Sequence, residues 1–323
     1  MKVAVLTKAR PEMLARITKE LDHVVAWAGE GDVWDDESLA KMADVEAMLV
    51  AAEPVHEQLL AACPRLKIVQ RLGVGYNTLD LEAAARRGIP CCNVAGVNKE
   101  AVAEHGMALI LALATKLVDT HQATRAGDWH GARLLTQDSI ELAGKTLGVI
   151  GLGDTGSSLA VRARSFGMGI VYNDVREIPP ETIEKVGARF MEKDDLFQAA
   201  DFVSINTDLN ETTAGMVDAR RIGLMKQGAY LICCARGGII DETALRDALE
   251  SGRLAGAGVD VFAEEPMPPG YPLLDAKNII VTAHVAGVNP ETSERSLQRA
   301  LDNMRAVVER GEKPRWVLNG VGE

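Results

Sequence analysis

The stretch TLGVIGLGDTG, residues 146–156, decides how the second half of this chain folds. Its apolar first half predicts a buried strand, and the segment from Ser157 to Phe166 predicts a helix. Between them lies the pattern G-x-G-x-x-G. In this pattern Gly151 permits a tight turn, Gly153 lets a ligand approach the backbone, and Gly156 lets helix and strand pack closely. Strand, turn and helix together predict a site for the phosphate groups of a dinucleotide.

A second apolar run, Ile170 to Asn173, ends at Asp174. In dinucleotide-binding folds an acid about 20 residues beyond the glycines accepts hydrogen bonds from the adenosine ribose. A carboxylate at this position repels the 2′-phosphate of NADP, so the sequence favours NAD over NADP as the cofactor. Arg176 lies two residues further on and would offset part of that repulsion.

Composition argues against several other classes of protein. The 323 residues include 35 Lys and Arg against 46 Asp and Glu, a net charge of −11, which disfavours nucleic acid or an anionic membrane as the main partner. The first residues predict a strand rather than a signal peptide, and the apolar run Gly106 to Ala114 is shorter than the ~20 residues of a membrane span. Five cysteines without a C-x-x-C pair predict reduced thiols, a cytoplasmic location and no metal site.

Apolar runs and helical segments alternate along the chain, which predicts an α/β protein with parallel sheets covered by helices on both faces. The first hundred residues show this alternation without the glycine pattern, so we expect two doubly wound domains. Asn289 to Arg310 has helical periodicity and begins with capping residues, and we expect it to return the chain to the first domain. The prediction is a Rossmann domain, residues 99–289, inserted into a flavodoxin-like substrate domain, residues 1–98 and 290–323.

The expected elements follow from these patterns. In the first domain strands are predicted at Val3–Leu6, Ala47–Val50, Lys67–Arg71 and Cys91–Val94, with helices near Pro11–Glu20, Ser38–Met42, Glu53–Ala62 and Leu81–Gly88. In the second domain strands are predicted at Leu147–Ile150, Gly169–Tyr172, Ala188–Phe190, Phe202–Asn206, Ala229–Cys233, Gly256–Asp260 and Ile279–Thr282. A long apolar helix is predicted over Lys99–Lys116, followed by a polar loop at Gly127–His130.

Three ionisable residues stand at or beyond predicted strand ends, after the glycine pattern. Arg236 and His284 each follow a strand, and Glu265 lies five residues beyond Asp260. Ligands of open α/β sheets bind beyond the carboxyl ends of the strands, so we expect these side chains to meet beside the nicotinamide. Taken singly, each also fits a structural role: a surface arginine, a turn glutamate and a structural histidine.

The chemistry of a 2-keto acid calls for these three residue types. A guanidinium group binds the carboxylate and polarises the adjacent carbonyl. A histidine supplies the proton when hydride reaches the carbonyl carbon, and a carboxylate fixes the tautomer of that histidine. The sequence therefore predicts an oxidoreductase that interconverts a 2-hydroxy acid and its 2-keto acid.

The segment CARGGIIDE, residues 234–242, resembles the signature of the D-isomer-specific 2-hydroxyacid dehydrogenases. Further similar segments are MKQGA at 225–229, DVFAEEP at 260–266, TAH at 282–284, GVG at 73–75 and AVAEH at 101–105. The resemblance covers nearly the whole chain. It is nearest to the 3-phosphoglycerate dehydrogenase branch, without the C-terminal regulatory domain of that branch.

The resemblance implies roles for individual residues. Arg236 would bind the substrate carboxylate and carbonyl, and His284, paired with Glu265, would be the general acid/base. The backbone of Gly73, Val74 and Gly75 would also bind the carboxylate. The cofactor-binding residues would be Gly151, Gly153, Asp154, Thr155, Gly156, Asp174, Thr207, Cys234, Ala235, Asp260, His284 and Gly287. The family is usually dimeric, which implies a homodimer with the Lys99–Lys116 helix at the interface.

Some positions depart from the family pattern and leave alternatives open. Asp154 stands where a basic residue is frequent, and an acid is unfavourable beside a pyrophosphate. Asn206, Asp208, Cys233 and Ala283 also replace frequent residues near the nicotinamide pocket.

Two arginines leave the substrate open. If Arg71 and Arg133 bind ligand, the substrate has a second anionic group, as in 3-phosphoglycerate or sulfolactate. If they are solvated, glycerate, hydroxypyruvate or glyoxylate fits better. An NAD(H)-sensing interaction protein, like the co-repressors built on this fold, is the alternative to an enzyme. Glu265 and Val74 speak against formate or phosphite oxidation.

Overall fold

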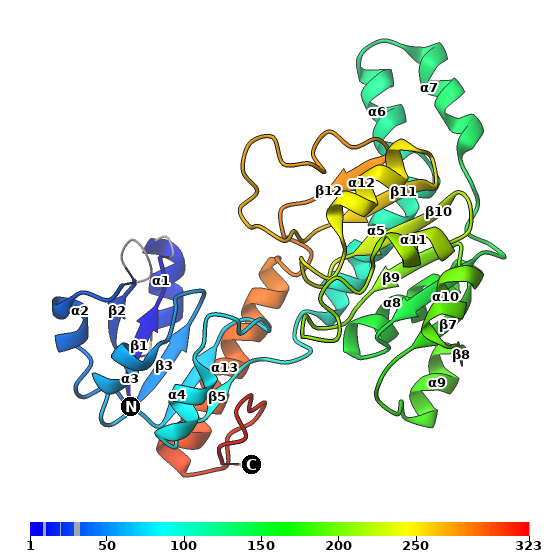
Figure 1. Ribbon diagram of the computed structural model, residues 1–323. Helices are drawn as coiled ribbons and strands as arrows, with labels where there is room; N and C mark the ends of the chain where they lie inside the picture. Colours follow the sequence, from blue (N-terminus) through cyan, green and yellow to red (C-terminus); the bar gives the residue numbers. More distant parts are fainter. Residues whose placement is uncertain (9–10, 20, 29–32, 323) are drawn as a thin grey trace. The chain divides into compact units, whose positions relative to one another are not determined.

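The computed structural model describes residues 1–8, 11–19, 21–28 and 33–322, and the chain divides into two compact units (Figure 1). Unit 1 comprises Met1–Asn98 and Asn289–Glu323, and unit 2 comprises Lys99–Val288. Each unit is built on one sheet in which all neighbouring strands are parallel. This confirms the predicted fold class of two parallel α/β domains.

Unit 1 has the strand order β2-β1-β3-β4-β5, which is the flavodoxin-like order. Its strands are β1 (Lys2–Leu6), β2 (Asp22–Ala26), β3 (Ala47–Val50), β4 (Ile68–Arg71) and β5 (Cys91–Cys92). Its helices are α1 (Pro11–Thr18), α2 (Asp36–Ala40), α3 (Glu57–Ala61), α4 (Leu81–Arg86) and α13 (Pro290–Arg310). Two buried clusters result: Leu59 of α3 and Ala83 of α4 belong to one, and Ile17 of α1 and Met304 of α13 to the other. The C-terminal helix is thus part of the core of unit 1.

Several elements of unit 1 differ from the sequence-based expectations. Strand β2 was missed because it lies at the sheet edge with only Ala26 buried, so its hydrophobic pattern is weak. The predicted helix Glu53–Ala62 begins only at Glu57, because the backbone of Val55 pairs instead with the segment around Leu79: Val55 N–H donates to the Thr78 carbonyl, and the Val55 carbonyl accepts the Asp80 N–H, each at 2.9 Å. The strand predicted to reach Val94 ends at Cys92. The expected helix end at Glu20 lies outside the described residues.

Unit 2 has the strand order β12-β11-β10-β9-β6-β7-β8. Counted from its own first strand this is 3-2-1-4-5-6-7, the Rossmann order with one further strand. The strands are β6 (Thr146–Ile150), β7 (Gly169–Asn173), β8 (Ala188–Phe190), β9 (Phe202–Ile205), β10 (Ala229–Cys233), β11 (Leu254–Val259) and β12 (Ile279–Val281). The order reverses between β6 and β9, so the ligand site of such a sheet lies beyond the carboxyl ends of these two strands.

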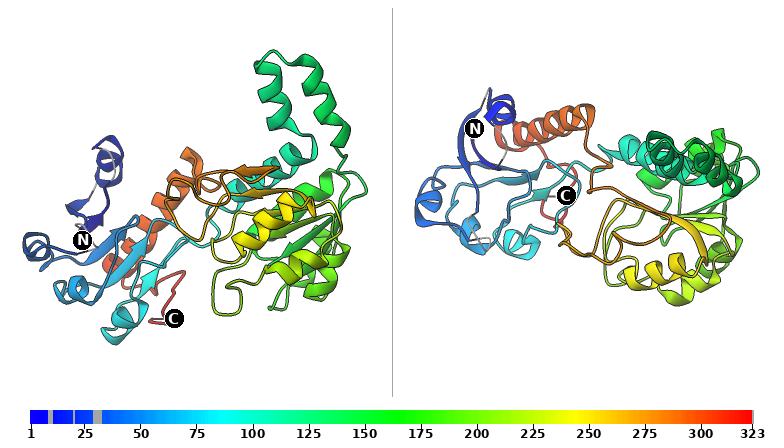
Figure 2. Two further views of the ribbon diagram at one scale, coloured as in Figure 1. Left: turned by 45° about the horizontal axis from the view of Figure 1, so that its top comes forward. Right: turned by 90° about the horizontal axis from the view of Figure 1, so that it is seen from above.

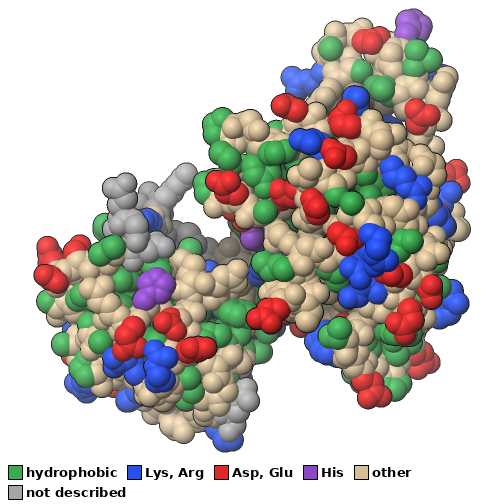
Figure 3. Space-filling model, in the orientation of Figure 1, with side chains coloured by type: hydrophobic (Ala, Val, Ile, Leu, Met, Phe, Trp, Pro, Cys, Tyr) green, Lys and Arg blue, Asp and Glu red, His purple; other side chains and the backbone are tan. Residues whose placement is uncertain are grey.

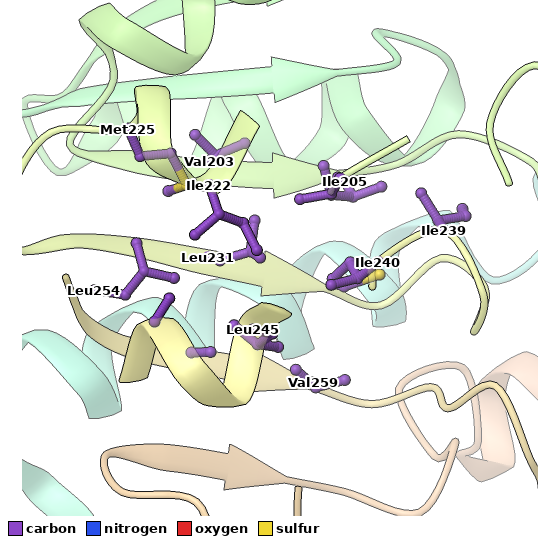
Figure 4. Close-up of a cluster of buried hydrophobic side chains, with 14 of the residues drawn as sticks. Val203, Ile205, Ile222, Met225, Leu231, Ile239, Ile240, Leu245, Leu254 and Val259 are labelled. Atoms are coloured by element: carbon purple, nitrogen blue, oxygen red, sulfur yellow. The ribbon is translucent and has the colours of Figure 1, made fainter. Parts of the chain in front are cut away.

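Helices cover both faces of this sheet (Figure 1). Residues of α5 (Lys99–Ala114) and α8 (Asp154–Ser165) share one buried cluster, to which Val186 of α9 (Pro180–Val186) also belongs. Residues of α10 (Lys193–Ala199), α11 (Ala219–Leu224) and α12 (Glu242–Glu250) share the other. Figure 4 shows how side chains of β9, β10 and β11 meet those of α11 and α12 in this second cluster.

The helical segment after α5 differs from the expectation. The predicted helix over Lys99–Lys116 ends at Ala114, and Lys116, at φ +55°, precedes the separate helix α6 (Leu117–Arg125). The loop predicted at Gly127–His130 was partly wrong, because Asp128 accepts the Gly131 N–H at 2.7 Å and caps α7 (Trp129–Leu135). Helices α6 and α7 pack on each other and project from the layers of unit 2 (Figures 1 and 2).

No single helix in the described part of the chain has the length and hydropathy to cross a membrane. Helices α5 and α6 pass that test only as a pair, and the pair is bent by 63°. On the face of unit 2 seen in Figure 3, acidic and basic side chains are interspersed rather than separated into large patches. Several charged side chains of unit 2 form ion pairs, such as Arg220 with Asp194 at 2.7 Å and Lys226 with Asp201 at 2.8 Å.

Replacing Leu231 by Ala tests the packing shown in Figure 4. Leu231 lies on β10 with no exposed surface, so the substitution is expected to lower the free energy of unfolding by about 2–5 kcal/mol. Leu274→Ala is the control, because 43 % of Leu274 is exposed. Urea unfolding followed by circular dichroism measures both. Equal stability of the two variants would contradict this account of the core.

Candidate active site

The glycine turn after β6 is packed against the ends of neighbouring strands. Gly151 has φ +88°, and its N–H donates to the Asn173 carbonyl at 2.8 Å. A Cβ atom on Gly151 would lie 2.8 Å from the Asn206 carbonyl oxygen, and one on Gly156 would lie 2.0 Å from the Gly151 carbonyl oxygen. Only glycine fits at either position without a shift of the backbone. The turn is therefore held where the strand order reverses.

The N-terminus of α8 begins directly after this turn. Gly153 is the N-cap residue and has no side chain to occupy the first N–H groups of the helix, which leaves them for an anion. The carboxylate of Asp154 lies 3.6 Å from the Lys99 ammonium group, and both side chains are largely exposed. Lys99 thus offsets part of the negative charge that Asp154 brings to the predicted phosphate site. Thr155 follows in the first turn of the helix.

Asp174 joins this turn to the end of β7. Its carboxylate accepts the Leu152 N–H at 2.8 Å and the Arg176 N–H at 2.9 Å, and the Arg176 guanidinium group donates to both of its oxygens at 3.2 Å. Burial by itself would raise the pKa of Asp174, but the hydrogen bonds and charge of Arg176, with the Leu152 N–H, outweigh it and hold that pKa below its usual value. Asp174 is therefore an ionised acceptor.

Thr207 adds a polar group beside the glycine turn. Its methyl carbon lies 2.9 Å from where a Gly151 Cβ atom would stand. Its hydroxyl group is buried and has no hydrogen-bond partner in the described part of the chain. Buried hydroxyl groups are normally hydrogen-bonded, so this one is suited to a ligand. The glycine turn, the N-terminus of α8, Asp174 and Thr207 together fit a dinucleotide.

His284 and Glu265 form a hydrogen-bonded pair beyond the carboxyl ends of β11 and β12. His284 Nδ1 lies 2.7 Å from Glu265 Oε2, and Glu265 Oε1 accepts the Phe262 N–H at 2.8 Å. An ionised carboxylate only accepts hydrogen bonds, so His284 Nδ1 carries the proton of this bond. Nε2 is left to exchange a proton with a ligand. Both side chains are partly exposed, at 48 % and 34 %, so a ligand can reach them.

Asp260 holds the segment that carries His284. Its side chain is buried, and its carboxylate accepts the N–H groups of Val285 and Ala286, each at 2.9 Å. It also accepts the Thr282 hydroxyl, and its backbone carbonyl accepts the His284 N–H at 2.8 Å. These bonds fix His284 in the left-handed backbone conformation, at φ +53°. The predicted contact of Asp260 and Gly287 with the cofactor stays a prediction.

Arg236 lies in the loop after β10. Its guanidinium group donates to the Ala235 carbonyl at 2.6 Å, and its side chain is half-buried. A Cβ atom on the next residue, Gly237, would lie 1.7 Å from the Phe262 carbonyl oxygen. This glycine therefore allows the Arg236 loop to contact the segment that leads to Glu265. Beside this loop, burial raises the pKa of the Cys233 thiol to about 11, so the thiol stays neutral.

Sequence reasoning missed two side chains that support the Glu265 segment. Glu242, the first residue of α12, accepts the Ala263 N–H at 2.8 Å and the hydroxyl group of Tyr271. Burial raises the pKa of Tyr271 to about 12, with a further contribution from Glu242, so the hydroxyl keeps its proton. The sequence signal was the acid at the end of the CARGGIIDE segment, but nothing in the sequence named Tyr271 as its partner.

The predicted substrate residues Gly73, Val74 and Gly75 lie in a loop of unit 1, and side chains of the same unit hold this loop in place. Arg71 Nε donates to the Gly75 carbonyl at 2.7 Å, and the Asn93 side chain donates to the Val74 carbonyl at 2.9 Å. Arg71 therefore shapes the loop that contains Gly73, Val74 and Gly75. Arg133 belongs to unit 2, where it is exposed on α7. The role of the loop in binding a carboxylate stays a prediction.

Comparison with known proteins gives consistent findings. Residues 107–286 match the family described as "D-isomer specific 2-hydroxyacid dehydrogenase, NAD binding domain". The glyoxylate reductase of Korarchaeum cryptofilum is 35 % identical over 303 residues, which cover 90 % of each chain. The D-3-phosphoglycerate dehydrogenase of Mycobacterium leprae is 35 % identical over 268 residues, 83 % of this chain and 50 % of the relative. Among solved structures, the apo D-mandelate dehydrogenase of Rhodotorula graminis has a TM-score of 0.88 at 26 % identity, covering 99 % of this chain and 98 % of the other.

Replacing Gly156 by Ala tests the glycine turn as a cofactor site. The new methyl group would meet the Gly151 carbonyl oxygen, so the turn must move, and the dissociation constant for NADH is expected to rise at least roughly tenfold. Gly223→Ala on α11 is the control, because a methyl group there meets nothing within 4 Å. Titration of NADH fluorescence measures both variants. Unchanged NADH affinity in Gly156→Ala would place the cofactor elsewhere.

Proposed function

This chain belongs to the D-isomer-specific 2-hydroxyacid dehydrogenases, and we propose that it interconverts a small 2-keto acid and its D-2-hydroxy acid with His284, Glu265 and Arg236 as catalytic residues. It is an NAD-dependent oxidoreductase, as this family membership shows. The observation that carries the proposed residue roles is the 2.7 Å hydrogen bond between His284 Nδ1 and Glu265 Oε2, beyond the carboxyl ends of the strands.

The proposed chemistry divides between the cofactor and the side chains. When bound, the nicotinamide would supply the hydride for reduction and accept it in oxidation. His284 Nε2 gives a proton to the substrate oxygen in reduction and removes it in oxidation. Glu265 holds Nδ1 protonated throughout and stabilises the imidazolium form. Arg236 binds the substrate carboxylate and polarises the neighbouring carbonyl through its several N–H donors.

Asp174 supports a preference for NAD over NADP. As an ionised acceptor it suits the two hydroxyl groups of the adenosine ribose and repels a 2′-phosphate. The Arg176 guanidinium group now occupies both carboxylate oxygens, but 65 % of the Arg176 side chain is exposed. We propose that this guanidinium group moves away when the ribose binds, and that the Leu152 N–H continues to hold the carboxylate.

We propose that the substrate carries one carboxylate and no second anionic group. Arg71, the cation expected to bind a second anion, uses its Nε to donate to the Gly75 carbonyl at 2.7 Å and thereby shapes its own loop. The glyoxylate reductases among the relatives, which the chain matches over about their whole length, support a substrate such as glyoxylate or hydroxypyruvate. A cytoplasmic location stays a prediction.

We also propose that two copies of the chain associate through α6 and α7 rather than through α5. The apolar residues of α5 are mostly buried in unit 2 itself, against α8, β10 and β11. The paired helices α6 and α7 instead expose a group of large apolar side chains: Leu117, Val118, Trp129, Leu134 and Leu135. A protein surface rarely exposes such a group unless another molecule covers it.

The proposed reaction is tested by NADH oxidation with glyoxylate, hydroxypyruvate, phosphohydroxypyruvate and sulfopyruvate, and by the same panel with NADPH. We expect turnover of at least one of the first two acids with NADH. His284→Ala should slow it by roughly 10²–10⁴-fold, because the proton donor is lost. Arg236→Ala should slow it by roughly 10²–10³-fold, because a positioned cation is lost.

Glu265→Gln tests the pairing of His284 with Glu265, and Glu264→Gln is its matched control. Glu264 is exposed beside Glu265, so its replacement should leave the rate near that of the natural protein, whereas Glu265→Gln should fall at least roughly tenfold. Full activity in both His284→Ala and Arg236→Ala would overturn the assignment. NADH-dependent binding of a partner protein without any turnover would favour the co-repressor alternative.

The proposed association is tested by light scattering of the purified protein. We expect a particle of twice the chain mass, and mainly monomer for the double variant Trp129→Glu/Leu134→Glu, because two charges would have to be buried. These side chains are 63 % and 62 % exposed, so the folded chain should tolerate the change. Leu274→Glu, at an exposed site that belongs to neither α6 nor α7, is the control. A monomeric natural protein would refute the proposal.

A further inference from the structure

A chain of hydrogen bonds runs from the middle of α5 to the segment that carries His284. His105 Nε2 lies 3.0 Å from the Thr282 hydroxyl oxygen, and this hydroxyl donates to Asp260 Oδ1 at 2.5 Å. His105 Nε2 is also 3.8 Å from the same carboxylate oxygen. The three residues lie on α5, just after β12 and just after β11, all within unit 2.

The positions of the hydrogen atoms in this series of hydrogen bonds follow from the number of donors and acceptors that each side chain has. The Asp260 carboxylate already accepts the N–H groups of Val285 and Ala286, which is the arrangement of an ionised carboxylate. The single Thr282 hydroxyl hydrogen points to Asp260, so the Thr282 oxygen can only accept in its other bond. His105 Nε2 must therefore carry the hydrogen that lies between the histidine and the threonine.

Thr282 and Asp260 act directly on the backbone around His284. The Thr282 and Asp260 carbonyl oxygens both accept the His284 N–H, at 3.1 Å and 2.8 Å. The Asp260 carboxylate holds the next two N–H groups in the chain. A change in the contact between Thr282 and Asp260 would therefore change the position of His284, which must be accurate for proton transfer.

We propose that His105 is a positioning residue for catalysis. Its Nε2–H orients the Thr282 hydroxyl toward Asp260, and Asp260 in turn fixes the backbone of His284. The inference rests on the proposed function of His284, but the hydrogen-bond direction that it requires can be measured without any turnover. A packing role alone would not need a polar ring here, since the part of α5 that follows, Met107 to Ala114, consists only of Ala, Leu, Met and Ile.

The first test is the tautomer of His105 by nitrogen-15 NMR of histidine-labelled protein at about pH 9, where histidine side chains are ordinarily neutral. The chain has six histidines, and the resonances of His105 are those that disappear in His105→Gln. A proton-bearing Nε2 is the expected result. An unprotonated Nε2 would overturn the proposal, even if the protein proves to be an active dehydrogenase.

The second test is kinetic. His105→Leu fills similar space without a donor, and its kcat for the preferred 2-keto acid should fall roughly tenfold with KM changed less than about twofold. His105→Gln keeps an N–H donor and should retain kcat within about threefold. His56→Leu is the control, because His56 is exposed and its side chain makes no cap hydrogen bond. Equal kcat for His105→Leu and the natural protein would overturn the proposal.

A double-mutant cycle shows whether His105 acts through Thr282. Thr282→Val removes the hydroxyl group, so adding His105→Leu to it should lower kcat no further. Losses that multiply would mean that His105 acts by another route, which would overturn the proposal. Thermal unfolding of each variant shows that the compared proteins are folded. If no variant, including the natural protein, turns over any keto acid, the proposed function fails, while the tautomer still decides the hydrogen-bond chain.

Discussion

The buried carboxylate of Asp260 is the interaction on which the candidate active site depends. It accepts two backbone N–H groups and the Thr282 hydroxyl, while its own carbonyl accepts the His284 N–H. A buried carboxylate without such donors would be costly, so the segment after β12 must close around it. Because the segment after β12 folds around this carboxylate, His284 lies next to Glu265. The position of the pair therefore depends on the backbone as much as on the two side chains.

Close backbone approach organises the rest of unit 2 in the same way. Gly151 and Gly156 bring β6, α8 and the end of β9 together, and Gly237 brings the Arg236 loop against the segment of Glu265. A side chain at any of these positions would meet a backbone atom at less than 3 Å, which is repulsive for all rotamers. The candidate dinucleotide site and the candidate catalytic site therefore have a feature in common: each has glycine where two segments at the strand ends come into contact.

The sequence predicts buried strands more accurately than strands at the edge of a sheet. Central strands such as β6 and β10 were located within a residue because their apolar runs are continuous. The half-exposed edge strand β2 was missed. The first two residues of α7, Trp129 and His130, were predicted to lie in a loop, because a single capping aspartate, Asp128, decides where that helix begins. At the site, strand ends drew attention to Arg236, Glu265 and His284, whereas His105 lies inside an apolar helix that offers no such mark.

The sequence by itself determined the two parallel α/β sheets, the glycine turn with its acid at the next strand end, and membership of a dehydrogenase family, because these are encoded in local periodicity and short spacing. The resemblance already implied that His284 pairs with Glu265, but only the tertiary structure decided that Nδ1 is the ring atom in this contact. It alone also decided that Arg176 covers Asp174 and that His105 is linked to Asp260 through Thr282. Such contacts depend on the positions of separate strand ends and helices in space. Local sequence carries no direct record of those positions, since they are set by the packing of the whole sheet.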